Sequence, residues 1–476
     1  MPRPARLRVP ADQASCSGTS SAAPGPKALA SGAGVRQGRD MSSVTLPVAL
    51  VGDGLRVPCV DGAERPYVSF DAAASTSALP QVMDAVEAFV PRYAGVHHGT
   101  GYKSQASALG FASAHRAALA FAGRGRDSDD VAIICRNTTE AINHLAYRLR
   151  LGAGDVVVTT VAEHYSNLLP WVRAAACRFV ECGQDGTFGT EDVVAALDQR
   201  PVPRLLAITG ASNVTGWLPP LPEIIAAAHH RGIPVLVDAA QLAPHRPLPR
   251  EADFLAWSGH KMYAPFGAGV LVGPRRVFMT GDPFLVGGGA AAMPGLGEVT
   301  WLDPPEREEA GSPNLIGAVA LGAAIGALEA VGWPAITSHD RRIAGSLRRG
   351  LAAIPAVRLL GPGPGTETLP VATFTVDGVP GALVAARLAA EEAIAVRYGS
   401  FYADPYLTRL LGPSPAPAGD DGHGAMPGAV RASAGINTSE QDVARLLTAV
   451  ARVVAGEPPV RYLRDPLTSE FHPAAA

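Results

Sequence analysis

Lys261 lies between two apolar, strand-like stretches of the sequence. Residues 253–273 read DFLAWSGHKMYAPFGAGVLVG, so Ser258 and His260 precede the lysine where the first stretch ends. Burying a lysine ammonium group is costly unless the charge is paired or removed, and burial therefore lowers the pKa of the amine. An amine of lowered pKa can form a Schiff base with a carbonyl group. This stretch predicts a reactive lysine rather than a structural one.

Polar side chains end several other apolar runs. Asp238 ends the run VLVD, and a buried carboxylate can hold a protonated ring nitrogen. His164 follows DVVVTT, and its imidazole can stack on an aromatic ring. Thr138 and Thr139 follow VAIIC at the start of an expected helix, where a phosphate is favoured. A carbonyl, a ring nitrogen and a phosphate together describe pyridoxal 5′-phosphate (PLP), which is the cofactor that these residues predict.

An alternation of strand-like and helix-like segments, beginning near residue 67, places these residues. The strand-like runs are short, rich in β-branched residues and separated by helical segments, which indicates an α/β fold with a mostly parallel sheet buried on both faces. Ligands of such sheets bind outside the carboxyl ends of the strands. Strands are expected, among others, at residues 131–135, 155–160, 204–210 and 233–241.

The composition and the pattern divide the chain into parts. We expect a disordered extension, an N-terminal segment, a large PLP-binding domain, a small C-terminal α+β domain and a tail, at residues 1–41, 42–66, 67–330, 331–460 and 461–476. The extension is rich in Ala, Ser, Gly and Pro and cannot build a core, and Met41 is an alternative start. A Pro- and Gly-rich segment at 412–428 is expected to be a mobile loop.

The composition argues against several classes of partner. The 476-residue chain has a formal net charge of −3, which gives no support to nucleic acid or an anionic membrane as a partner. The longest apolar run, at 315–328, is too short to span a bilayer. Five cysteines without paired or metal-like spacing predict a reduced, cytoplasmic protein with no metal site. They are Cys16, Cys59, Cys135, Cys177 and Cys182.

Short motifs along the chain resemble, in order, those of the fold-type I, class V aminotransferase family of PLP-dependent enzymes, in particular its cysteine desulfurase branch. The similarity includes the lysine motif SGHKMYAPFGAGVL and covers roughly residues 67–455. Each motif alone is weak, and their common order makes the resemblance specific. The others are FDAAAST (70–76), VHHGTGYKSQA (96–106), RNTTEAIN (136–143), AEHYSNLLPW (162–171), ITGASNVTG (208–216), VLVDAAQ (235–241), EEAGSPN (308–314) and VRASAGINT (430–438).

The resemblance implies a role in cofactor binding for each matching residue. Lys261 would be the Schiff-base lysine, Asp238 the partner of the pyridinium nitrogen, and His164 the residue that stacks on the ring. Gln241 and Asn213 would contact the ring oxygen or the substrate. The phosphate ligands would be Thr138, Thr139, Ser258, His260 and, from the neighbouring subunit of a homodimer, Ser312.

The resemblance also implies an α-amino acid substrate. Arg431 matches the arginine that grips the substrate α-carboxylate, a task suited to a planar bidentate donor. His98 and Tyr402 are candidates to line the substrate pocket. Glu163, which precedes the stacking histidine, is interpreted as structural.

One position departs from the desulfurase pattern. In that branch a loop carries a nucleophilic cysteine, and the corresponding segment here, IAVRYGSFYADPY (394–406), has Tyr402 in its place. No cysteine follows Cys182 in the chain. A thiolate is needed to accept sulfur as a persulfide, and a phenol, with a reference pKa of about 10, cannot replace it. Persulfide transfer from this loop is therefore not expected.

Several reactions fit these residues. The favoured hypothesis is a lyase that cleaves the C–S bond of cysteine or a cysteine conjugate by β-elimination. A class V aminotransferase and an epimerase similar to the isopenicillin N epimerase branch are the alternatives, because the fate of the substrate depends on acid groups around Cα and Cβ. A non-catalytic PLP-binding scaffold is disfavoured by the presence of both Lys261 and Arg431, since a scaffold needs no clamp for a substrate carboxylate.

Overall fold

The structure is a computed structural model that describes residues 46–96, 99–125, 127–294, 297–412 and 428–474. The expected disordered extension lies outside the described residues, as does most of the expected loop at 412–428.

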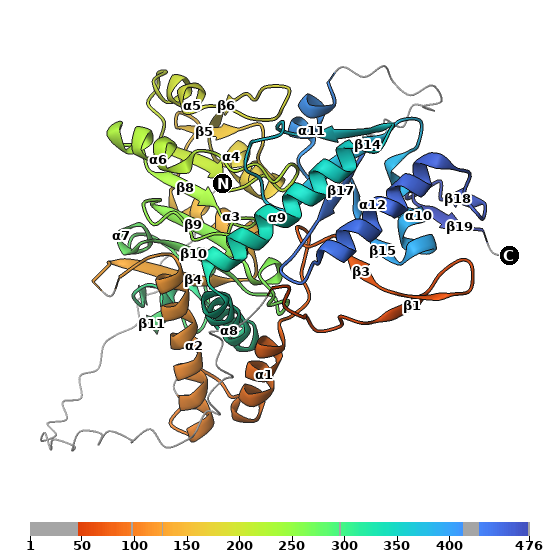
Figure 1. Ribbon diagram of the computed structural model, residues 1–476. Helices are drawn as coiled ribbons and strands as arrows, with labels where there is room; N and C mark the ends of the chain where they lie inside the picture. The colour runs from red at the N-terminus through yellow and green to blue at the C-terminus, as the bar shows by residue number, and fades with distance from the viewer. Residues whose placement is uncertain (1–45, 97–98, 126, 295–296, 413–427, 475–476) are drawn as a thin grey trace, which may run out of the picture. The chain divides into compact units, whose positions relative to one another are not determined.

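A seven-stranded sheet forms the centre of the large part of the molecule, with the strand order β4-β10-β9-β8-β7-β5-β6 (Figure 1). Neighbouring strands are parallel except at β10, which runs antiparallel to both β4 and β9. The expectation of a mostly parallel central sheet is confirmed. The strands are β4 (Asp130–Cys135), β5 (Val156–Thr160), β6 (Ala176–Val180), β7 (Leu205–Thr209), β8 (Val235–Asp238), β9 (Phe254–Ser258) and β10 (Gly269–Pro274).

Different helices cover the two faces of this sheet. Successive strand residues point to opposite faces, and in β10 Val270 and Val272 join one core whereas Leu271 joins another. The face of Leu271 packs against α3 (Thr138–Arg148), α4 (Leu169–Ala174) and α7 (Arg275–Phe278). The other face packs against α1 (Pro80–Phe89), α2 (Tyr102–Phe121), α5 (Thr190–Leu197), α6 (Leu221–His230) and α8 (Leu315–Val331).

A second, antiparallel sheet has the strand order β13-β14-β17-β16. Its strands are β13 (Val357–Leu360), β14 (Val371–Val376), β16 (Arg397–Gly399) and β17 (Ala429–Ser433). Helices α9 (Trp333–Ala352), α10 (Gly381–Glu392) and α12 (Glu440–Ala455) share its hydrophobic core. A capping box begins α12: the Ser439 hydroxyl accepts from the Asp442 amide at 3.1 Å, and the Asp442 carboxylate accepts from the Ser439 amide at 2.8 Å.

The segment IAVRYG forms two short strands rather than one. Ile394–Ala395 (β15) pairs in parallel with Val68–Ser69 (β3), whereas β16 pairs with β17. The break between them lets the chain change pairing partners, and the loop after β16 leads directly into α11 (Asp404–Leu411).

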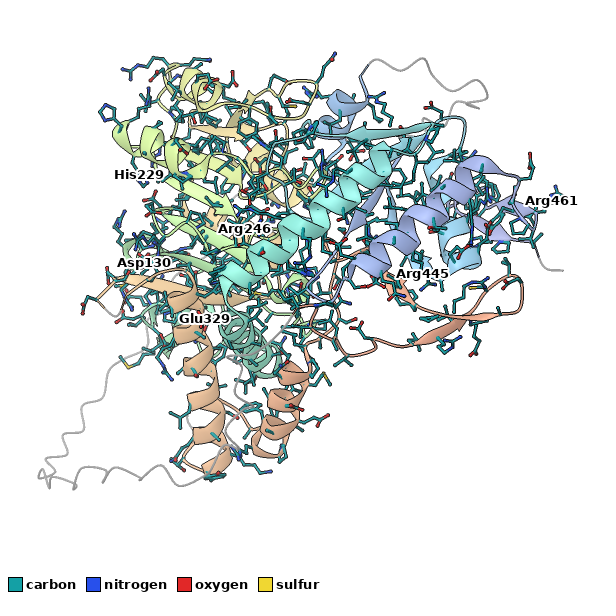
Figure 2. The ribbon with its side chains drawn as sticks, in the orientation of Figure 1. Asp130, His229, Arg246, Glu329, Arg445 and Arg461 are labelled. Carbon is teal, nitrogen blue, oxygen red and sulfur yellow. The ribbon has the colours of Figure 1, made fainter. Side chains whose placement is uncertain are left out.

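The two sheets are joined through the beginning of α9. Arg246, labelled beside this helix in Figure 2, donates from Nη1 to Asp340 Oδ2 at 2.7 Å. His245 lies 3.1 Å from the same oxygen through Nδ1. Asp340 is fully buried, and both basic side chains reach its Oδ2, whereas its Oδ1 has no hydrogen-bond partner among the described residues.

The segment expected to form the tail contains two short strands. Strands β18 (Tyr462–Arg464) and β19 (Phe471–Pro473) form a hairpin whose turn is fixed by Asp465, which accepts from the Leu467 and Thr468 amides at 2.7 and 3.0 Å. The Tyr462 hydroxyl holds it to α10 through Glu391, at 3.1 Å.

The remaining described elements are short. No single helix in the described ranges is long and apolar enough to cross a membrane, and the one pair that passes together, α8 and α9, is bent by 82°. The short elements are β1 (Arg56–Pro58), β2 (Glu64–Pro66), β11 (Ala291–Pro294), β12 (Val299–Trp301) and the 3-10 helices η2 (Val90–Arg92), η3 (Tyr165–Asn167), η4 (Gly259–Lys261) and η5 (Glu306–Glu308).

Candidate active site

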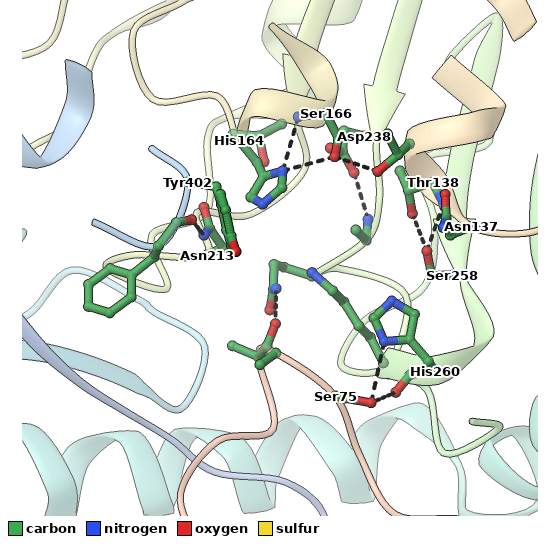
Figure 3. A pocket seen from close by; sticks show the side chains of 18 of the residues that line it. Ser75, Asn137, Thr138, His164, Ser166, Asn213, Asp238, Ser258, His260 and Tyr402 are labelled. Atoms are coloured by element: carbon green, nitrogen blue, oxygen red, sulfur yellow. Dashed lines mark hydrogen bonds between the residues drawn. The ribbon is translucent and has the colours of Figure 1, made fainter. Parts of the chain in front are cut away.

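A pocket of about 420 Å³ opens beyond the carboxyl ends of the central strands (Figure 3). The structure brings nearly all the residues singled out in the sequence to its wall. Ser312 is exposed and is not part of the wall, and His98 lies outside the described residues. The predicted residues that line the pocket are Thr138, Thr139, His164, Asn213, Asp238, Gln241, Ser258, His260, Lys261, Tyr402 and Arg431.

Lys261 ends the short helix η4, directly after β9. Burial lowers the pKa of its amine from 10.5 to about 8, against the opposing influence of the Asp238 carboxylate. Asp238 ends β8 and is 5% exposed, with Oδ1 accepting from the Ala240 amide at 2.9 Å. Burial raises the pKa of Asp238, while that hydrogen bond and the Lys261 charge lower it. The floor of the pocket thus holds an amine that loses its proton more readily than an ordinary lysine, with a carboxyl group close to it.

Hydroxyl groups gather at the start of α3. The side chain of Asn137 caps this helix by accepting from the Glu140 amide at 3.0 Å, which places the next two residues at the helix N-terminus. Ser258 Oγ lies 2.7 Å from the Thr138 amide and 2.6 Å from its hydroxyl (Figure 3). Thr139 Oγ1 lies 2.7 Å from Ser166 Oγ. Such a group of donors at a helix N-terminus suits a phosphate.

Two histidines in neutral form, His164 and His260, line the pocket together with Lys261. Burial, reinforced by the Lys261 charge, lowers the pKa of both His164 and His260 to about 4. The Ser166 amide donates to His164 Nδ1 at 3.1 Å, so a neutral His164 carries its proton on Nε2. The Nδ1 atom of His260 lies 3.3 Å from Ser75 Oγ.

Arg431 reaches the pocket from β17. Its Nη1 donates to the Asn213 carbonyl at 2.9 Å, and its Nη2 lies 3.5 Å from Asp71 Oδ1. The guanidinium carbon lies 4.8 Å from the centre of the Phe401 ring. Burial lowers the pKa of Arg431 to about 10. Its Nε is buried, and no described residue accepts a hydrogen bond from it, so Arg431 retains a donor for an anionic ligand.

The loop that carries Tyr402 is held in an unusual conformation. Phe401 and Tyr402 have φ angles of 58° and 56°, in the left-handed region that residues with a side chain rarely adopt. Asn213 Nδ2 donates to the Phe401 carbonyl at 2.9 Å, and the Tyr165 amide donates to the Tyr402 carbonyl at 2.9 Å. The Tyr402 ring then meets the His164 ring edge to face, with 5.7 Å between centroids.

Comparison with known proteins identifies the family. The model of the class V aminotransferases matches residues 68–446. The chain belongs to this family. It is 33% identical to a cysteine desulfurase of Cronobacter sakazakii, over 82% of this chain and 94% of the relative. It is 30% identical to a cysteine desulfurase of Haloferax volcanii, over 74% and 84%.

Solved structures of this family have the same fold. The apo cysteine desulfurase of Thermococcus onnurineus NA1 superposes with a TM-score of 0.74 at 29% identity, covering 82% of this chain and 95% of the other. The Escherichia coli cysteine desulfurase CsdA, in an S-sulfonic acid form, gives a TM-score of 0.70 at 30% identity, covering 82% and 94%.

Members of the class V family are PLP-dependent enzymes, and this pocket fits PLP. The amine of lowered pKa, the buried carboxyl group and the hydroxyl-lined helix N-terminus match the aldehyde, the ring nitrogen and the phosphate of the cofactor. The neutral imidazole of His164 adds a flat, uncharged surface on the same wall. The individual roles of these residues remain proposals.

Two charged residues at the edge of the pocket, Arg397 and Asp71, were missed in the sequence. Arg397 lines the pocket, and it donates from Nε and Nη2 to the two carboxylate oxygens of Asp71 at 3.0 and 2.6 Å. Both residues stand within the segments FDAAAST and IAVRYGSFYADPY. The signal that could have found them is a charged residue in an apolar context in each segment, acidic in the first and basic in the second.

Proposed function

We propose that the protein is a PLP-dependent lyase that cleaves the C–S bond of cysteine or a cysteine conjugate by β-elimination. The observation that carries the proposal is the position of Tyr402, which lies on the wall of the same pocket as Lys261 and stands where the desulfurase pattern has a cysteine. The match to cysteine desulfurases supports a sulfur-containing amino acid as substrate. The phenol supports a reaction that needs no thiol on the loop.

Each step of this reaction would depend on a particular residue of the chain. Arg431 would bind the α-carboxylate through its buried, unpartnered Nε. Lys261, with a pKa of about 8, would take the Cα proton at Nζ. Bound PLP supplies an electron sink for the charge left at Cα.

The leaving group would depart from Cβ as a thiol. The Cβ–S bond breaks as its electrons leave with sulfur, and the Tyr402 hydroxyl would supply the proton that sulfur gains. A carbon–carbon double bond forms between Cα and Cβ, and the released enamine is hydrolysed to pyruvate and ammonia.

A substrate panel with product mass spectrometry tests the proposal. L-cysteine and S-substituted cysteines should yield thiol or sulfide with equimolar pyruvate, and Tyr402→Phe should slow this about 10²-fold if the phenol is the acid. Tyr147→Phe, at a half-exposed tyrosine on α3, is the matched control. Product that requires a keto-acid acceptor would instead identify an aminotransferase. Deuterium uptake at Cα with inversion would identify an epimerase. PLP binding with no turnover of any substrate would identify a scaffold.

We further propose that the enzyme is a cytoplasmic homodimer in which Ser312 reaches the neighbouring subunit's phosphate. Large apolar side chains at α2 and around β11 support a covered surface: Tyr102, Leu109, Val286 and Met293 are between 67% and 73% exposed. The four cysteines of the described chain are free, which supports a reducing compartment. Sedimentation should give twice the chain mass, and a monomer that still binds PLP would refute the shared site.

A further inference from the structure

The carboxyl group of Glu163 is completely enclosed beside the pocket. Its residue is 1% exposed, and three donors point at it. Oε1 accepts from the Thr160 hydroxyl at 2.7 Å and from the Thr209 amide at 3.0 Å, and Oε2 accepts from Asn167 Nδ2 at 2.7 Å. Glu163 does not line the pocket, so it acts on bound groups through its neighbours.

The direction of two of these hydrogen bonds is fixed by chemistry. An indole N–H can only donate, and Trp171 Nε1 donates to Asn167 Oδ1 at 3.0 Å. The amide of Asn167 must therefore turn its Nδ2 toward Glu163, which leaves Oε2 as an acceptor. The Thr209 backbone N–H can likewise only donate, so Oε1 is an acceptor too. The site requires a group with two accepting oxygens.

These bonds close the turn that carries the ring-side residues. The side chains of Glu163 and Asn167 are hydrogen-bonded to each other, on either side of residues 164–166. The backbone N–H of Asn167 also donates to the His164 carbonyl at 2.8 Å. On its other side Glu163 is tied to Thr209, the last residue of β7, whose register partner on β8 is Asp238. A single carboxyl group thus links the turn of His164 to the strand end of Asp238.

We propose that Glu163 is a positioning residue for the cofactor: it sets the His164 turn against the strand end of Asp238. This role goes beyond the proposed lyase function, because it concerns PLP binding whichever reaction follows. Burial raises the pKa of Glu163 to about 8 against its three hydrogen bonds, and the Asp238 charge raises it further. The other charged groups facing the pocket are Lys261, Arg397 and Arg431.

Glu163→Gln is the direct test. An amide offers one acceptor and one donor, so whichever way it turns, one fixed donor loses its partner. The cofactor-free variant relieves this by moving the turn, and PLP must then reverse the movement on binding. We expect the dissociation constant of PLP to rise about tenfold. The pH midpoint of the bound cofactor's visible band should also move, because the turn that carries His164 no longer holds its place in the pocket wall.

A compensating variant separates positioning from stability alone. In Glu163→Gln/Asn167→Asp, the new carboxylate accepts from both Gln Nε2 and Trp171 Nε1, while Gln Oε1 keeps Thr160 and Thr209. Every donor regains a partner. Asn167→Asp alone brings two carboxyl groups to the 2.7 Å contact and completes the double-mutant cycle. We expect the double variant to recover most of the PLP affinity and of the midpoint.

Further variants keep the test decisive if Glu163→Gln does not fold. Thr160→Val removes one of the three donors, and should shift both readouts in the same direction by less. Glu191→Gln, on the exposed start of α5, should change neither. The proposal is overturned if Glu163→Gln or Thr160→Val lowers the melting temperature while affinity and midpoint stay unchanged, or if the double variant is no better than Glu163→Gln.

Discussion

The Asp71 carboxylate binds the Arg397 guanidinium through two hydrogen bonds, at 3.0 and 2.6 Å, at the edge of the pocket. The same carboxylate lies 3.5 Å from Nη2 of Arg431. Arg397 is therefore largely neutralised by Asp71, whereas the longer contact and the orphaned Nε leave Arg431 as the stronger site for an added carboxylate.

Loss of Arg431 should weaken amino-acid binding more than loss of Arg397. A hydrogen-bonded charge pair contributes about 1.5–3 kcal/mol, so Arg431→Ala should raise KM by about 10- to 100-fold. Arg397 is 46% exposed and already paired, and Arg397→Ala should raise KM less than about fivefold. Steady-state kinetics with L-cysteine or an S-substituted cysteine measure both. Equal effects would contradict the assignment of the carboxylate to Arg431.

The rate of PLP capture should rise with pH. Burial lowers the pKa of Lys261 to about 8, and only the neutral amine attacks a carbonyl. The neutral fraction grows about tenfold between pH 7 and pH 9 for a group with this pKa. Stopped-flow recording of the visible band in cofactor-free enzyme should follow this curve, and Lys261→Ala should give no band. A midpoint near 10.5 would show that Lys261 is not buried as described.

Acid should destabilise the cofactor-free protein through His164. Its pKa is about 4 in the folded state and about 6.5 when unfolded, so the unfolded chain binds the extra proton between these values. The free energy of unfolding therefore falls as pH drops from 6.5 to 4. His164→Asn should reduce this fall by up to about 3 kcal/mol in urea titrations. His230→Asn, on the exposed end of α6, is the control and should leave the slope unchanged.

Glycine should suit position 402 better than alanine. Tyr402 has a φ of 56° and a ring that is mostly exposed, so both substitutions lose similar packing. A left-handed residue with a Cβ costs about 1–2 kcal/mol, which glycine avoids at some cost in chain entropy. Urea unfolding should show Tyr402→Gly more stable than Tyr402→Ala by about 1 kcal/mol. The reverse order would mean that the Phe401–Tyr402 turn does not hold this conformation in solution.

A thiol at position 402 should acquire sulfur. Tyr402→Cys places a cysteine on the pocket wall with Arg397 on the same wall, and a nearby cation favours the thiolate. The thiolate would attack the sulfur of bound L-cysteine, the Cβ–S bond would break and alanine would leave, so intact-protein mass spectrometry should show an adduct of one sulfur atom that a reductant removes. Tyr402→Ser is the matched control and should show none. Absence of the adduct in an active Tyr402→Cys enzyme would separate this position from the loop cysteine of desulfurases.

The strand-end residues could be predicted because their setting is local. Asp238 and Ser258 end runs of buried β-branched or apolar residues, and the carboxyl edge of a parallel sheet collects such residues. The reversed direction of β10 was also readable: residues 259–268 separate it from β9, too few for a crossover helix.

The pairs formed between distant segments could not be predicted in this way. Asp71 and Arg397 are 326 residues apart, and neither position carries a periodic signal for the other. The change of partner between β15 and β16 depends on β3 and β17, which belong to different sheets. Two of the donors to Glu163, Thr160 and Asn167, are its neighbours in the sequence, but the third, Thr209, is 46 residues away and is brought to it by the fold.

The hydrogen bond from the Ala73 amide to the Ser433 hydroxyl, at 3.0 Å, spans 360 residues of chain. When synthesis has reached the end of β10, every strand of the central sheet has been made. Asp238 and Lys261 have been made as well. Synthesis reaches β17, which carries Arg431, only much later. The residues proposed to bind the cofactor are therefore made long before Arg431, the residue proposed to bind the substrate carboxylate.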